Sequence, residues 1–153
     1  MTTMLRGVNH LTLDVKGRLA VPTRYREELA RQDSGRMVAT IDFAERCLLL
    51  YPLADWAEIE RKLVALPSLD PAAQRLKRLL LGHANDCELD GAGRVLLPPP
   101  LRDYAKLEKH VVMIGQGNKF EVWDEQSWNE RREQWLGAGP LTSTAVELET
   151  LSL

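Results

Sequence analysis

The chain has 153 residues, of which 44% are hydrophobic and 27% are charged, a composition typical of a globular protein that forms one domain or two small units sharing a core. It contains no run of 18 uncharged apolar residues, and Met1–Arg6 do not resemble a secretory signal, so we expect no membrane span and a cytoplasmic location. The two cysteines, Cys47 and Cys87, lie in or beside apolar runs and are expected to be reduced, buried thiols.

Charge is distributed unevenly along the chain, although the net charge is only −2. Residues 1–32 carry six cationic and three anionic side chains, whereas residues 121–153 carry two cationic and seven anionic ones. The net charge therefore does not indicate nucleic-acid binding, but the basic first segment permits a polyanionic partner.

An internal repeat organises the chain. Leu13–Pro22 (LDVKGRLAVP) aligns with Leu89–Pro98 (LDGAGRVLLP) at an offset of 76, and Leu50–Trp56 aligns with Val122–Trp128 at an offset of 72. We therefore expect a first unit over 4–66, an inter-unit helix within 67–82, a second unit over 83–136 and a loosely ordered tail over 137–153. Two such units bury more surface together than either does alone, and their remaining apolar helix faces predict self-association.

The expected elements follow the same order in both units. In the first unit they are an extended segment (5–13), a turn, a short strand (19–21), a helix (23–30), a strand pair (37–41 and 47–51) and an amphipathic helix with Trp56 and Leu63. In the second unit the segments are 84–89, 95–97, 101–107, and 111–114 with 120–123, followed by a helix from about 124. Loops are expected at 42–46 and 115–118. Asp70, Pro71 and Gly82 predict the ends of the inter-unit helix.

The residues that stand out are two matched Asp-x-x-Gly-Arg turns: Asp14, Gly17 and Arg18 in the first unit, and Asp90, Gly93 and Arg94 in the second. Glycine permits a positive φ and the aspartate can accept hydrogen bonds from turn amides, so both residue types are explained by structure. The arginines have two interpretations of about equal weight. They pair with the aspartates, or a rigid turn presents them, together with Arg26 and Arg102, to DNA. Lys16 adds a cation to the first turn, whereas Ala92 occupies the equivalent position in the second.

The sequence as a whole resembles the MraZ family of bacterial regulators, over about residues 4–136. The matching segments are Leu13–Arg26 (LDVKGRLAVPTRYR), Cys47–Pro52 (CLLLYP), Leu79–Ala84 (LLLGHA), Asp90–Arg94 (DGAGR), Asn118–Glu121 (NKFE) and Trp123-Asp124. The resemblance implies an α+β fold of two tandem AbrB-like swapped-hairpin β-barrel units, related by a pseudo-two-fold axis, with peripheral helices.

The resemblance also implies a function. Members are similar to transcription factors that form ring-like homo-oligomers, bind short direct repeats in the promoter of the division and cell-wall gene cluster, and usually repress it. The expected partners are therefore double-stranded promoter DNA and further copies of the chain, at the nucleoid. The implied DNA contacts are Lys16 and Arg18, helped by Arg24 and Arg26, with Arg94 and Arg102 as weaker second-unit equivalents. Pro98–Pro100 replaces Pro22-Thr23-Arg24 and removes one arginine from the second unit.

Other functions are less well supported by the sequence. An antitoxin-like or adaptor protein of the same fold class would bind a protein partner through its tail. His83 and Cys87 are four residues apart, which is a weak metal signal without a second ligand pair. No phosphate loop, nucleophile elbow or zinc-protease motif is present, so we expect no catalytic residue, cofactor, metal or small-molecule ligand. Trp56, Trp128 and Trp135 lie at helical spacing and indicate packing rather than base stacking.

Overall fold

The computed structural model describes residues 4–143 and 145–151, and it confirms a mixed α+β protein. The first unit contains β1 (Leu5–Thr12), β2 (Arg18–Ala20), α1 (Thr23–Arg31), the 3-10 helix η1 (Asp33–Gly35), β3 (Arg36–Ile41), β4 (Leu48–Pro52) and α2 (Leu53–Val64). Helix α3 (Pro71–Leu80) follows. The second unit contains β5 (Asn85–Glu88), β6 (Arg94–Leu96), α4 (Pro99–Tyr104), β7 (His110–Gly117), β8 (Phe120–Asp124) and α5 (Glu125–Leu136), and α6 (Val146–Glu149) lies beyond it.

The strands of the two units exchange partners. The larger sheet has the order β1-β7-β8-β4-β3-β5, and all its neighbours are antiparallel. The first strand of each unit therefore pairs with the hairpin of the other unit: β1 lies against β7 and β5 against β3. Strands β2 and β6 form a second, two-stranded sheet, again with one strand from each unit. Neither unit completes its sheet without the other.

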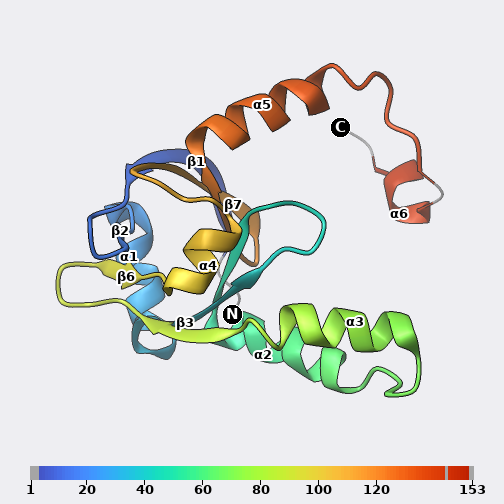
Figure 1. Cartoon of the computed structure of the whole chain (residues 1–153), viewed down its shortest axis with the longest axis horizontal. Helices are drawn as coiled ribbons and strands as arrows, with labels where there is room; N and C mark the ends of the chain where they lie inside the picture. The colour runs from blue at the N-terminus through green and yellow to red at the C-terminus, as the bar shows by residue number, and fades with distance from the viewer. Residues whose placement is uncertain (1–3, 144, 152–153) are drawn as a thin grey trace.

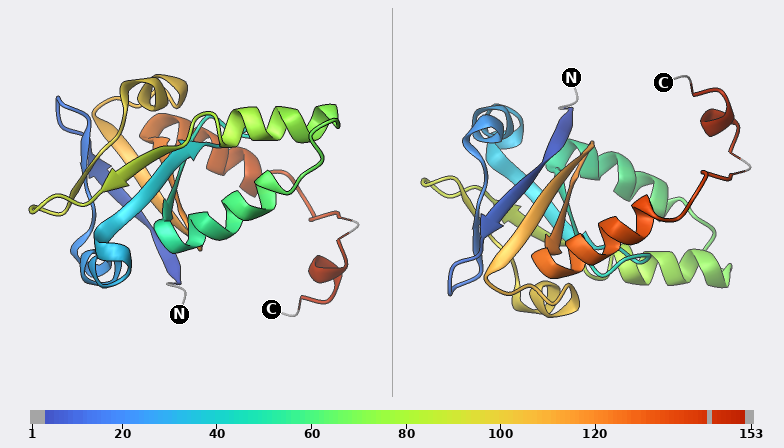
Figure 2. Two further views of the ribbon diagram at one scale, coloured as in Figure 1. Left: turned by 90° about the horizontal axis from the view of Figure 1, so that it is seen from below. Right: turned by 90° about the horizontal axis from the view of Figure 1, so that it is seen from above.

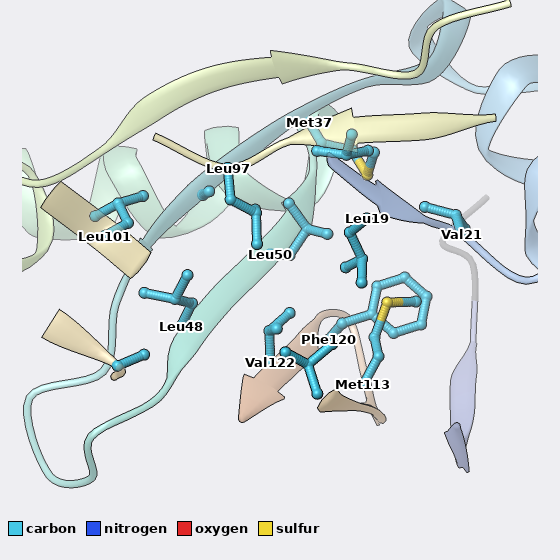
Figure 3. Packing of buried hydrophobic residues seen from close by; sticks show 14 of the residues in the cluster. Leu19, Val21, Met37, Leu48, Leu50, Leu97, Leu101, Met113, Phe120 and Val122 are labelled. Carbon is cyan, nitrogen blue, oxygen red and sulfur yellow. The ribbon is translucent and has the colours of Figure 1, made fainter. Parts of the chain in front are cut away.

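One hydrophobic core is built from both units (Figure 3). Leu19 of β2 faces Val95 of β6 in register, and both side chains are fully buried. Phe120 of β8 is also fully buried and packs edge-on against Tyr25 of α1, with ring centroids 5.0 Å apart. Because these contacts cross between the units, the two halves of the chain stabilise each other.

The helices lie on the outside of the sheets (Figure 1). Helices α2 and α3 form a pair, and Trp56 and Leu63 of α2 pack in a second apolar cluster with Val38 of β3. The predicted caps of α3 are largely confirmed, because the Asp70 side chain accepts a hydrogen bond from the Ala73 amide. Helix α5 has no buried residue among those described, and it contacts the sheet through Trp128 and Trp135, each with its ring centroid 5.7 Å from that of Trp123.

Two sequence expectations need correction. The expected loop over 115–118 is mostly strand, because β7 continues to Gly117 and pairs along the whole of β1, with Leu5 opposite Gly117. Helix α4 begins at Pro99, two residues before the expected start at Leu101, because proline is well suited to the first helical turn. Among the described residues, no helix has the length and apolar character needed to cross a membrane.

Candidate nucleic-acid interface

The two Asp-x-x-Gly-Arg turns project from the same end of the molecule, opposite helices α2 and α3 (Figure 2). Each is closed by the same backbone hydrogen bonds. The amide of Asp14 donates to the Arg18 carbonyl over 3.1 Å, and the amide of Asp90 donates to the Arg94 carbonyl over 2.9 Å. Gly17 and Gly93 have φ angles of +87° and +75°, which explains the glycine at both positions.

The aspartate of each turn holds the turn backbone and the arginine at the same time. One carboxylate oxygen of Asp14 accepts the amides of Lys16 and Arg18 over 3.0 and 2.9 Å, and the other lies 2.6 Å from Nε of Arg18. Asp90 makes the same contacts with the amides of Ala92 and Arg94 and with Arg94 Nε, each over 2.9 Å. Hydrogen bonding from the Arg18 amide is the main cause that lowers the pKa of Asp14 to about 2.

The arginine–aspartate pairing expected from sequence is therefore present in both turns. It does not bury the arginines, since 30% of the Arg18 side chain and 35% of the Arg94 side chain remain exposed. A guanidinium group has five N–H donors, and the contact through Nε restrains its orientation. The arginines are thus positioned by the turns while remaining accessible to a ligand.

Arg26 and Arg102 lie against the turns of the opposite units. Nε of Arg102 donates to the Leu97 carbonyl over 3.0 Å, and a Cβ atom at Gly17 would lie only 2.5 Å from Cζ of Arg102. Nε of Arg26 donates to the Val21 carbonyl over 2.6 Å, and its side chain lies equally close to Gly93. Strand exchange explains this arrangement. The sequence placed Arg26 beside the first turn, whereas the structure places it beside the second.

Arg24 is not brought to either turn. Its guanidinium bonds to the side chain of Asn9, halfway along β1, and lies 4.8 Å from the ring centroid of Tyr25. Asn9 is five residues from Asp14, which corresponds to roughly 16 Å of extended strand. Lys16, by contrast, is exposed at the tip of the first turn, next to Val15, whose exposed fraction is 100%.

Lys109 also lies beside the first turn, although the turn motifs in the sequence do not include it. Its carbonyl accepts the Leu13 amide over 2.8 Å, and the residue lines a groove of about 620 Å³ beside the first turn, together with Asp14, Val15 and Arg102. The short basic segment Lys106–His110 was the only sequence signal for it, because the pairing of β1 with β7 is not readable from residue spacing.

The possible metal donors lie elsewhere. Within the described residues, the donor atoms of Asp42, Cys47 and Glu121 lie within 4.8 Å of one another. Glu121 already accepts a hydrogen bond from the Trp123 indole over 2.8 Å, and burial strongly raises the pKa of the Cys47 thiol, which disfavours the thiolate that a metal needs. His83 and Cys87 belong to no such group in the described part of the chain.

These observations define the class of protein: a two-unit, strand-exchanged α+β protein that presents a pair of arginine-bearing turns at one end. Comparison with known proteins gives the family. The sequence matches the family described as "MraZ protein, putative antitoxin-like" over residues 4–79 and 80–139, and the chain belongs to this family.

Similar proteins include three named "Transcriptional regulator MraZ". The one from Halorhodospira halophila is 59% identical, that from Legionella pneumophila strain Corby is 57% identical, and that from Yersinia pseudotuberculosis is 51% identical. Each comparison covers 98% of this chain and 100% of the relative.

Proposed function

We propose that the chain is a sequence-specific regulator of transcription that binds double-stranded promoter DNA through its turns and has no catalytic activity. Its target is short direct repeats upstream of the division and cell-wall gene cluster, which it represses as a ring-like homo-oligomer at the nucleoid in the cytoplasm. The names of the similar proteins support the regulatory role, and the resemblance described above supports the choice of target.

The observation that carries the proposal is the construction of the first turn. Arg18 is oriented by Asp14 yet 30% exposed, and Lys16 extends beside it at the tip. The planar guanidinium suits two hydrogen bonds to guanine or to a phosphate, and a β-ribbon is narrow enough to enter the major groove. The exchange of β1 and β5 between the units supports an AbrB-like swapped hairpin as the element that presents the turn.

Self-association is part of the proposal because one turn binds too weakly alone. A bidentate contact contributes about 1–3 kcal/mol of discrimination, which is insufficient to select a promoter. Several turns on one oligomer raise the effective concentration of each contact after the first has formed. Apolar side chains that remain exposed, Phe43 at 55%, Val64 at 62% and Leu69 at 95%, support an additional protein interface.

The test is fluorescence anisotropy of the full-length protein with its own upstream DNA over a range of salt concentrations. We expect tight binding that weakens steeply with salt, and a loss of at least about tenfold for Arg18→Ala, equivalent to roughly 1.4 kcal/mol. Arg132→Ala, which removes an exposed arginine from α5, is the matched control and should bind like the parent. Binding no stronger than to a scrambled duplex would refute the regulator.

The oligomer requires a separate measurement. Sedimentation velocity should give a single species larger than the monomer, and substitutions that make the protein monomeric should weaken promoter binding. A monomeric variant that binds the promoter as tightly as the parent would show that oligomer formation is unnecessary.

A second candidate function is an antitoxin-like or adaptor protein that binds a protein partner. The tail beyond α5 favours it, because Leu141, Val146 and Leu151 are 86%, 65% and 59% exposed. Deleting the tail separates the candidates: DNA binding should survive in a regulator, whereas an adaptor should lose its partner. A neighbouring nuclease gene would favour the antitoxin, and neighbouring cell-wall genes the regulator.

A further inference from the structure

We propose that the second unit completes the DNA site of the first turn by supplying Lys109 and Arg102 to the DNA backbone, each to its own phosphate, and that the second turn has no equivalent site. This inference rests on the proposed DNA-binding function. It implies that one chain presents a single composite DNA site.

The groove beside the first turn provides the geometry. One wall consists of residues 12–15, and the other consists of Arg102 and residues 107–109, with a volume of about 620 Å³. The two walls are held together, because the Leu13 amide donates to the Lys109 carbonyl over 2.8 Å. Arg102 is fixed at the turn itself, through its hydrogen bond to Leu97 and its packing on Gly17.

The charge of the groove suits a phosphate. Lys109 and Arg102 line it, and Lys16 and Arg18 belong to the adjoining turn. Two carboxylates also line the groove, those of Asp14 and Glu108, and the Asp14 charge is already paired with Arg18. The groove lining alone carries two cations and two anions, and the positive excess comes from Lys16 and Arg18 of the adjoining turn, which bring the count to four cations against two anions.

Lys109 is assigned to phosphate rather than to a base because of its position. The tip of the turn is formed by Val15 and Lys16, whereas Lys109 immediately precedes β7, alongside the segment that leads from β1 to the turn. A ribbon whose tip enters the major groove places its flanks next to the backbone. Lysine also acts there as a flexible point charge that suits any phosphate and reads no sequence.

The second turn lacks the equivalents of Lys109 and Lys16. The Leu89 amide, which is equivalent to the Leu13 amide, donates to Gly35, so a glycine occupies the position of Lys109. At the tip, Gly91 and Ala92 replace Val15 and Lys16. The pair equivalent to Arg18 and Arg102 is retained there as Arg94 and Arg26. Arg36 follows Gly35, but it lies opposite Glu88, and its Nε donates to the Asp33 carbonyl over 3.0 Å, away from the turn.

The test compares Lys109→Gln with Lys62→Gln in the full-length protein, by anisotropy over a salt series on the promoter duplex and on a scrambled duplex. Lys62 is an exposed lysine of α2, a helix that lies away from the turns, and it serves as the control. One lost phosphate contact reduces the salt slope by about 0.9, which corresponds to roughly eightfold weaker binding at 0.1 M salt. We expect this loss on both duplexes for Lys109→Gln, no loss for Lys62→Gln, and near-parental binding for Lys109→Arg.

Several results would overturn the inference. Equal binding by the two glutamine variants would show that Lys109 does not contact DNA. A loss of affinity confined to the promoter duplex, with an unchanged salt slope, would show that Lys109 contacts a base. An equal loss from Arg94→Ala and Arg18→Ala would show that both turns bind DNA. If the parent protein binds no DNA, the proposed function itself fails. If the parent binds DNA and Lys109→Gln binds equally well, only the inference about Lys109 fails. Circular dichroism and thermal melting confirm that each variant is folded.

Discussion

Replacing Gly17 with alanine tests how the first turn is built. The φ angle of +87° is unfavourable for an L-residue and costs about 1–2 kcal/mol. The new Cβ would lie 2.5 Å from Cζ and 2.6 Å from Nε of Arg102, which is the far end of a flexible side chain. Arg102 is therefore displaced while the backbone stays in place, and the loss in stability should remain about 1–2 kcal/mol of a total of roughly 5–15 kcal/mol.

The assay pairs urea unfolding with DNA anisotropy, and Gly93→Ala is the matched control. At Gly93 the φ angle is +75° and a Cβ would lie 2.5 Å from Cδ of Arg26, so the two variants should lose similar stability. Their DNA affinities should differ, with roughly eightfold weaker binding at 0.1 M salt for Gly17→Ala alone. Equal losses of affinity, or unchanged stability of Gly17→Ala, would refute the reasoning.

Three further predictions concern stability and reactivity. Leu19→Ala should lower the free energy of unfolding by about 2–5 kcal/mol in one urea transition, because Leu19 is fully buried in the shared core, and two separate transitions would contradict that core. Because the pKa of Asp14 is lowered to about 2, its carboxylate stabilises the fold above pH 4 and ceases to do so as the pH falls toward 2. The melting temperatures of the parent and Asp14→Asn should differ at pH 7 and converge near pH 2, and a gap that stays constant would contradict this. Burial raises the pKa of Cys87 to about 11, so about one thiol in a thousand is ionised at pH 8, and burial also raises the pKa of Cys47. Iodoacetamide should label native protein slowly and urea-unfolded protein quickly, and rapid labelling of native protein would refute the expected protection.

Local signals in the sequence predicted most of the elements. The inter-unit helix was predicted because Asp70 caps its first turn and Pro71 suits its first position. The tight turns were predicted because glycine adopts a positive φ there and aspartate accepts hydrogen bonds from nearby amides. Strand partners were not predictable in the same way. A strand such as β1 shows the same residue pattern whether it pairs within its own unit or, as here, with β7 of the other.

The missed parts of the candidate site follow from that exchange. Arg26 and Arg102 were recognised as equivalent residues, but spacing could not show that each lies against the turn of the other unit. Lys109 has no counterpart in the aligned turn segments, and it reaches the first turn only through the pairing of β1 with β7. Residues that act through long-range pairing are therefore the ones that sequence patterns alone leave unassigned.

The proposed difference in function between the two turns has a physical basis in this fold. Asp14, Gly17 and Arg18 form contacts within their turn, and their equivalents in the second unit are the same residue types. The positions that differ, Val15 and Lys16 against Gly91 and Ala92, are exposed and support no core packing. Strand exchange requires both turns to keep their shape, because β2 and β6 form one small sheet. It places no such requirement on the exposed charges, so the first turn can carry the proposed DNA surface while the second turn lacks it and keeps only the shared shape.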